Sequence, residues 1–200
     1  MYKQKTKAKL LLEDGTEFIG YSFGYEGNTN GEVVFNTGMV GYPETLTDPS
    51  YCGQILVCTY PLIGNYGVPS KEKENNLYKH FESDKIHIRA LIVTDYSFEY
   101  SHWSAERSLA DWLKEEKIPG IYGIDTRILT RKLRDKGTML GKIIIDENLK
   151  IDFEDPSKKN FVREVSVKEL IEYKAGKKKV VLVDCGTKNN IIRAFLGRNI

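Results

Sequence analysis

Three cysteines and three histidines are the side chains of this sequence best suited to nucleophilic or metal chemistry. They are Cys52, Cys58, Cys185, His80, His87 and His102. The cysteines form no CxxC pair and the histidines show neither HxH nor HxxxH spacing, so we expect no metal site. A cysteine nucleophile needs a neighbouring base, because a thiol with a pKa of about 8.5 is only slightly ionised at neutral pH. No histidine follows Cys185. We therefore predict that this thiol is buried and serves packing, and that the chain carries no catalytic residue.

Binding of nucleotides, nucleic acids or membranes is not indicated. Gly20, Gly24 and Gly27 do not form a GxGxxG loop, and the sequence contains no Walker lysine loop. The 30 basic and 28 acidic side chains give a net charge of +2, too small to attract nucleic acid or an anionic membrane broadly. No apolar run approaches the ~20 residues that cross a bilayer, and the first residues lack the apolar core of a signal peptide. We expect no cofactor on this chain and a cytoplasmic location.

The segment 31–67 is dense in turn-forming residues. Glycine, proline, asparagine and small hydroxyl residues interrupt two short strands there, as in functional loops carried by a rigid sheet. Ser50 follows Pro49 in such a turn, where it can offer a hydroxyl and a backbone amide to a ligand. The alternative is that Ser50 serves turn geometry alone. A hydrolase with Ser50 as nucleophile is disfavoured, since no base lies at an identifiable spacing.

Strands and two longer helices must position these residues. Apolar runs predict strands at 8–13, 16–22, 32–36, 54–60, 86–94 and 139–145. Ser104 is predicted to cap a helix that ends near residue 116. Asp125 is predicted to cap a second helix with Ile128, Leu129 and Leu133 facing inward.

The composition changes after residue 145. Residues 146–179 are rich in lysine, glutamate, aspartate and asparagine, and we predict a connector with a short helix at 167–173. The apolar run at 180–184 then predicts a buried parallel strand, and 191–196 an amphipathic helix, as at the opening of a βαβ unit. One β-α unit cannot bury both faces of a parallel strand, so we expect the chain to stop inside a second domain. The predicted units are 1–145, the connector 146–179, and 180–200.

Several motifs occur in one order along the sequence. They are L-E-D-G-T-E-F at 12–18, G-E-V-V-F-N-T at 31–37, M-V-G-Y-P-E-T-L-T-D-P-S-Y at 39–51, Q-I-L-V-C-T-Y-P-L-I-G-N-Y-G at 54–67, I-D-T-R-I-L-T-R-K-L-R-D-K-G at 124–137, and V-D-C-G-T-K-N-N-I-I-R ending at Arg193. In content and order they closely resemble the amino-terminal part of the small, glutamine-hydrolysing subunit of carbamoyl-phosphate synthase. The resemblance extends from near residue 8 to the end of the sequence.

The resemblance implies an α/β fold. The family joins a swivelling β/β/α-type amino-terminal domain to a flavodoxin-like glutaminase domain of the triad type, of which 180–200 would be the first β-α unit, truncated. The glutaminase releases ammonia, which travels through a tunnel to a large subunit that uses ATP and Mg²⁺. Its nucleophile is a cysteine in a G-x-C-x-G elbow, with a downstream histidine and glutamate. This elbow is missing here, so the chain alone is predicted to be inactive.

The resemblance also implies roles and partners. In the family the serine of the D-P-S-Y turn reaches the glutaminase cleft and helps to hold glutamine; here that serine is Ser50. The expected partners are the large synthetase subunit and glutamine, in pyrimidine and arginine precursor synthesis. The main alternative is a non-enzymatic, stand-alone binding or assembly domain of the same fold.

Overall fold

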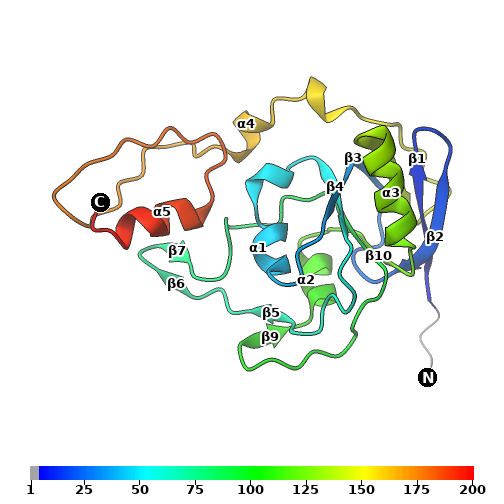
Figure 1. Ribbon diagram of the computed structural model, residues 1–200, viewed down its shortest axis with the longest axis horizontal. Coiled ribbons are helices and arrows are strands. Elements are labelled where there is room, and N and C mark those ends of the chain that lie inside the picture. Colours follow the sequence, from blue (N-terminus) through cyan, green and yellow to red (C-terminus); the bar gives the residue numbers. More distant parts are fainter. Residues whose placement is uncertain (1–4) are drawn as a thin grey trace.

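A closed, seven-stranded mixed sheet forms the body of the computed structural model, which describes residues 5–200 (Figure 1). Its strands follow the order β1-β11-β3-β4-β8-β10-β2, and β2 pairs with β1 to close the sheet. The strands of the closed sheet are β1 Lys7–Leu12, β2 Glu17–Ser22, β3 Thr29–Asn36, β4 Gln54–Cys58, β8 Ala90–Val93, β10 Gly120–Tyr122 and β11 Met139–Ile144. The predicted mixture of helix and strand is confirmed.

Shorter elements surround this sheet. Two small antiparallel pairs join β5 Val68–Pro69 to β9 Ala105–Arg107, and β6 Lys73–Glu74 to β7 Leu77–Tyr78. The helices are α1 Tyr42–Leu46, α2 Leu109–Glu115, α3 Thr126–Lys136, α4 Phe161–Val165 and α5 Asn189–Leu196, with 3-10 turns η1 Pro49–Tyr51 and η2 Pro156–Lys158. Among the described residues, no helix has the length and apolar character needed to cross a membrane.

The core consists of two apolar clusters separated by the parallel strands. Alternate side chains of a strand point to opposite faces. On β4, Ile55 and Val57 therefore join the cluster enclosed by the sheet. Leu56 joins the other cluster, which lies beneath α1 and α2 and is called the outer cluster below. β8 is likewise buried throughout, which explains its unbroken apolar sequence. The antiparallel strands β1 and β11 bury only every second residue, as expected of strands with one face toward the core.

The two longer helices confirm most of the predicted burial but not every boundary. Ser108, not Ser104, caps α2, and its hydroxyl oxygen accepts a hydrogen bond from the Asp111 amide at 3.1 Å. Ser104 instead contacts the His102 ring, and the residues between the two serines pair with β5 as β9. The prediction was wrong by one turn because both serines stand before acidic and apolar residues.

Asp125 caps α3 as predicted, and its carboxylate accepts from the Ile128 amide at 2.9 Å. Leu129 and Leu133 are buried, but Ile128 is 56% exposed, so the prediction that it faces inward was wrong. One residue along a helix turns the side chain by about 100°. A helix side that buries Leu129 therefore directs its neighbour Ile128 toward solvent.

The carboxyl-terminal third differs most from expectation. Residues 167–173 are irregular, and the short helix of the connector is α4, which begins after its cap Asn160. Residues 180–184 form no strand, since within residues 5–200 no other strand pairs with them. Consequently Val181 is 91% exposed instead of buried. The helix predicted at 191–196 is confirmed as α5. The boundaries 1–145, 146–179 and 180–200 stay predictions, and residues 1–4 lie outside the described part.

Candidate functional site at the Asp48–Tyr51 turn

Ser50 lies on η1, between α1 and β4. Asp48 caps this turn, and its Oδ1 accepts a hydrogen bond from the Ser50 amide at 2.9 Å. Pro49 occupies the first position, where its missing N–H leaves no donor unpaired. The amide of Ser50 is thus already occupied. Its exposed hydroxyl remains as the group that can bind a ligand.

A second turn, residues 184–187, precedes α5. The Asp184 carboxylate accepts from the amides of Gly186 at 2.8 Å, Thr187 at 2.6 Å and Val167 at 2.7 Å. Partial burial alone would raise the pKa of Asp184, but these three donors hold it below its ordinary value. Gly186 has a φ of +101°, a conformation that favours glycine. The turn is therefore a defined structure although the segment before it is irregular.

The two turns lie side by side. Lys188 Nζ is 2.6 Å from Asp48 Oδ2, and this contact raises the pKa of Lys188. A Cβ atom on Gly186 would lie 3.3 Å from Cβ of Pro49, closer than ordinary van der Waals contact, so the backbones of the two turns approach each other directly. The structure therefore brings Ser50 next to the start of the predicted second unit.

Asp48, Lys188, Glu82 and Arg193 were not identified from the sequence. Asp48 uses one oxygen for the Ser50 turn and the other for Lys188. Glu82 is buried and contacts Arg193 at 2.9 Å. An aspartate two residues before a serine is a signal for a side-chain turn, so Asp48 could have been found. Glu82 lies in a polar stretch without periodicity, which gave no such signal.

The three cysteines differ in accessibility. Cys58 is buried, and burial raises the pKa of its thiol to about 12. Cys52 is half-buried; burial, with the nearby Glu164 carboxylate, raises its pKa as well. Cys185 is exposed, so the prediction of a buried packing thiol was wrong. Its turn lies on the surface because residues 180–184 do not enter a sheet.

We expect thiol reagents to modify the cysteines in the order Cys185, Cys52, Cys58. A reagent reaches the exposed thiol of Cys185 directly, whereas burial makes a thiol inaccessible and also raises its pKa, which keeps it protonated. Timed alkylation of the native chain, followed by mass spectrometry of its peptides, measures the order. Modification of Cys58 at the rate of Cys185 would contradict the buried position of β4.

The histidines are separated in the structure. The Nε2 atom of His87 lies 3.0 Å from Oγ of Ser83, and burial lowers the pKa of this imidazole. His102 contacts Ser104. Across residues 5–200, no group of three His, Cys, Asp or Glu side chains is arranged to hold a metal ion.

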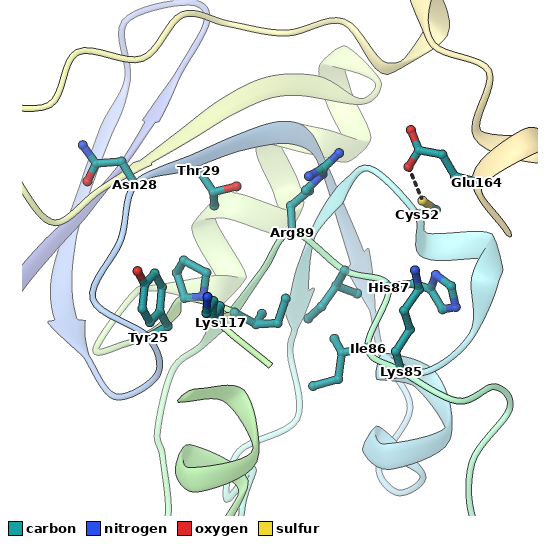
Figure 2. A pocket seen from close by; sticks show the side chains of 13 residues that line it. Tyr25, Asn28, Thr29, Cys52, Lys85, Ile86, His87, Arg89, Lys117 and Glu164 are labelled. Carbon is teal, nitrogen blue, oxygen red and sulfur yellow. Dashed lines mark hydrogen bonds between the residues drawn. The ribbon is translucent and has the colours of Figure 1, made fainter. Parts of the chain in front are cut away.

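A hollow of about 250 Å³ borders the Ser50 turn at Cys52, the residue that ends η1. Figure 2 shows Arg89 between Thr29 and the contact of Cys52 with Glu164. Lys117 lies beside Tyr25. Cys52 Sγ is 3.9 Å from the Glu164 carboxylate. The lining is polar and positively charged on balance.

Known proteins resemble nearly the whole chain. A family profile described as carbamoyl-phosphate synthase small chain, CPSase domain, matches residues 10–143. The chain is 54% identical over 213 residues to multifunctional protein pyr1-3 of Dictyostelium discoideum, covering 98% of the chain and 10% of the relative. It is 54% identical over 194 residues to human mitochondrial carbamoyl-phosphate synthase [ammonia], covering 96% and 13%. The arginine-specific small chain of carbamoyl phosphate synthase from Saccharomyces cerevisiae is 47% identical over 204 residues, covering 99% and 50%. The chain thus spans half or less of these relatives.

Proposed function

This chain belongs to the carbamoyl-phosphate synthase small-chain family, and from that premise we propose that it docks the large synthetase subunit and positions glutamine for hydrolysis. Residues 10–143 are the CPSase domain of the small chain. The resemblance found in the sequence motifs is thereby confirmed. The role of individual residues, and of residues 180–200, is the proposal.

One observation carries the proposal: the turn that bears Ser50 lies against residues 184–188. Lys188 and Asp48 are 2.6 Å apart, and the Ser50 hydroxyl is exposed beside this contact. In the resemblance, residues 180–200 correspond to the entry into the glutaminase. A hydroxyl at this junction can donate to a carboxylate or accept from an ammonium group of an amino acid such as glutamine.

The proposed reaction is divided between two chains. The glutaminase releases ammonia from the glutamine carboxamide, and the large subunit uses the ammonia with ATP and Mg²⁺ to form carbamoyl phosphate. No cofactor is proposed on this chain. One relative is named arginine-specific, and pyrimidine and arginine precursor synthesis are the pathways proposed. A cytoplasmic location is part of the proposal, although the human relative is named mitochondrial.

The proposal predicts that the purified 200-residue chain releases no ammonia from glutamine. It should nevertheless bind a large carbamoyl-phosphate synthase subunit. A coupled glutamate dehydrogenase assay measures ammonia, and analytical ultracentrifugation of the mixture measures binding. Turnover above the rate without protein would contradict the absence of a catalytic residue, and absence of binding would contradict the docking role.

The rival is a stand-alone binding domain. Its support is that the sheet closes through the β1–β2 pairing and encloses its own apolar cluster, with contributions from α3 alone among the helices. Such a domain needs no further segment to bury its strands. Ammonia release by the chain once it is joined to a complete glutaminase segment would decide for the proposed function. Failure of that joined protein to hydrolyse glutamine, while folded, would favour the rival.

A further inference from the structure

We infer that Glu82 and Asp48 are positioning residues that clamp α5 and its cap residue Lys188, and thereby fix residues 184–196 beside Ser50. The inference deepens the proposed function and rests on it only for the consequence for glutamine. α5 lies beside β7, on the side of the molecule away from the β1–β2 hairpin (Figure 1).

Glu82 is only 8% exposed, and both of its carboxylate oxygens are used by α5. Oε1 lies 2.9 Å from Nη2 of Arg193, and Oε2 accepts from the Asn190 amide at 2.8 Å. The Glu82 carbonyl accepts from the Asn189 amide at 2.8 Å. A buried carboxylate is costly unless it is paired and hydrogen-bonded. Within residues 5–200 every partner of this carboxylate comes from α5, so release of α5 would leave its charge unpaired.

Neighbouring carbonyl groups add to the contact. Arg193 Nη1 donates to the carbonyls of Tyr78 and Phe81, and the side-chain amide of Asn189 donates to the Phe81 carbonyl at 3.1 Å. The guanidinium therefore bridges one carboxylate and two backbone oxygens. Such a planar, multiple contact fixes direction as well as distance.

The same part of the fold holds Ser50. The Glu82 amide donates to Oγ1 of Thr47 at 2.9 Å, and the Ser83 hydroxyl donates to the Thr47 carbonyl at 2.6 Å. Thr47 precedes Asp48, whose carboxylate binds the Ser50 amide and Lys188. Ser50 and both clamping carboxylates thus belong to one hydrogen-bonded unit. The position of α5 relative to Ser50 is set by this unit.

The irregular segment 180–183 does not set that position. Val181 and Val183 are 91% and 81% exposed, and within the described residues the segment 180–184 pairs with no strand. A segment with few buried contacts and no backbone ladder opens readily. The attachment of α5 therefore depends on the two carboxylates, on the donors of Arg193 and Asn189 to backbone carbonyls, and on the 184–187 turn.

The test compares three variants of the chain by native hydrogen exchange of residues 189–196. Glu82→Gln and Arg193→Gln each remove one charge of the clamp. The control, Glu17→Gln, removes one charge of the solvent-accessible Lys9–Glu17 pair, whose charged atoms are 3.3 Å apart and which joins β1 to β2 on the side of the molecule away from α5 (Figure 1). We expect α5 amides to exchange roughly tenfold faster or more in both clamp variants and unchanged in the control. Unchanged exchange in Arg193→Gln, a substitution on the helix itself that spares the closed sheet, would overturn the inference.

A second readout separates positioning from structure. In the chain joined to a complete glutaminase segment, Glu82→Gln should raise the KM for glutamine severalfold and leave kcat nearly unchanged, with Arg193→Lys closer to the parent than Arg193→Gln. Faster exchange with an unchanged KM would overturn the positioning role. If the joined parent protein hydrolyses no glutamine, the proposed function fails, and the exchange data still decide on the clamp.

Discussion

Trp112→Ala should lower the free energy of unfolding by about 3–5 kcal/mol. Trp112 lies on α2, is 2% exposed, and packs in the outer cluster with Phe81 at a ring distance of 5.2 Å. Removing the indole leaves a large cavity that the closed sheet cannot fill by moving. Denaturant unfolding followed by circular dichroism measures the change without relying on the lost tryptophan.

The other tryptophan is a matched control. Trp103 is 90% exposed, so Trp103→Ala should change stability by no more than about 0.5 kcal/mol. Trp112→Phe should cost much less than Trp112→Ala, because the buried indole Nε1 has no hydrogen-bond partner within residues 5–200. Equal losses for Trp112→Ala and Trp103→Ala would contradict the outer cluster as described.

Trp112 also connects stability to the candidate site. Its neighbour Phe81 precedes Glu82 and supplies the carbonyl that Asn189 and Arg193 contact. A cavity beneath Phe81 would loosen the residues that hold α5. The outer cluster therefore does more than stabilise the sheet, because it fixes the surface against which α5 lies.

Local sequence signals predicted elements whose partners are close or whose burial follows a simple period. The β1–β2 hairpin turns at Gly15, with a φ of +83°, as the Asp-Gly pair predicts. Asp125 caps the start of α3 with its side chain, and Gly137, with a φ of +89°, ends the helix. β10 was missed because a strand of three residues gives too short a pattern. Residues 180–184 have strand character but no partner strand in the described chain, and propensity alone does not pair a strand.

In the candidate site, too, the residues with a local sequence signal were predicted and those with distant partners were not. Ser50 was identified through a contiguous motif, and its turn is held by the adjacent Asp48. Glu82 and Asn190 are 108 residues apart, and nothing in either local sequence indicates the other. Pairs of this kind depend on how the whole chain folds. The contact between Glu82 and Asn190 is therefore found only in the folded structure.

Ser50→Ala should raise the KM for glutamine roughly ten- to hundredfold in the chain joined to a complete glutaminase segment, with kcat little changed. A hydrogen bond to a charged group of the ligand contributes about 1.5–3 kcal/mol, which corresponds to this range. Steady-state glutaminase kinetics measures the effect. The substitution removes no hydrogen bond within residues 5–200, since the amide of Ser50, not its hydroxyl, binds Asp48.

The chain contains its own control for this experiment. Asp155, Pro156 and Ser157 form a second turn of the same type, in which the Asp155 carboxylate accepts from the Ser157 amide at 2.9 Å. Ser157 is exposed like Ser50. Among the described residues, however, only the Ser50 turn contacts the segment before α5, through Asp48 with Lys188 and Pro49 with Gly186. Ser157→Ala should therefore leave the KM unchanged. The same KM for Ser50→Ala and the parent protein would remove Ser50 from the glutamine site, whereas equal rises in both variants would assign the effect to the turn type and not to its place beside α5.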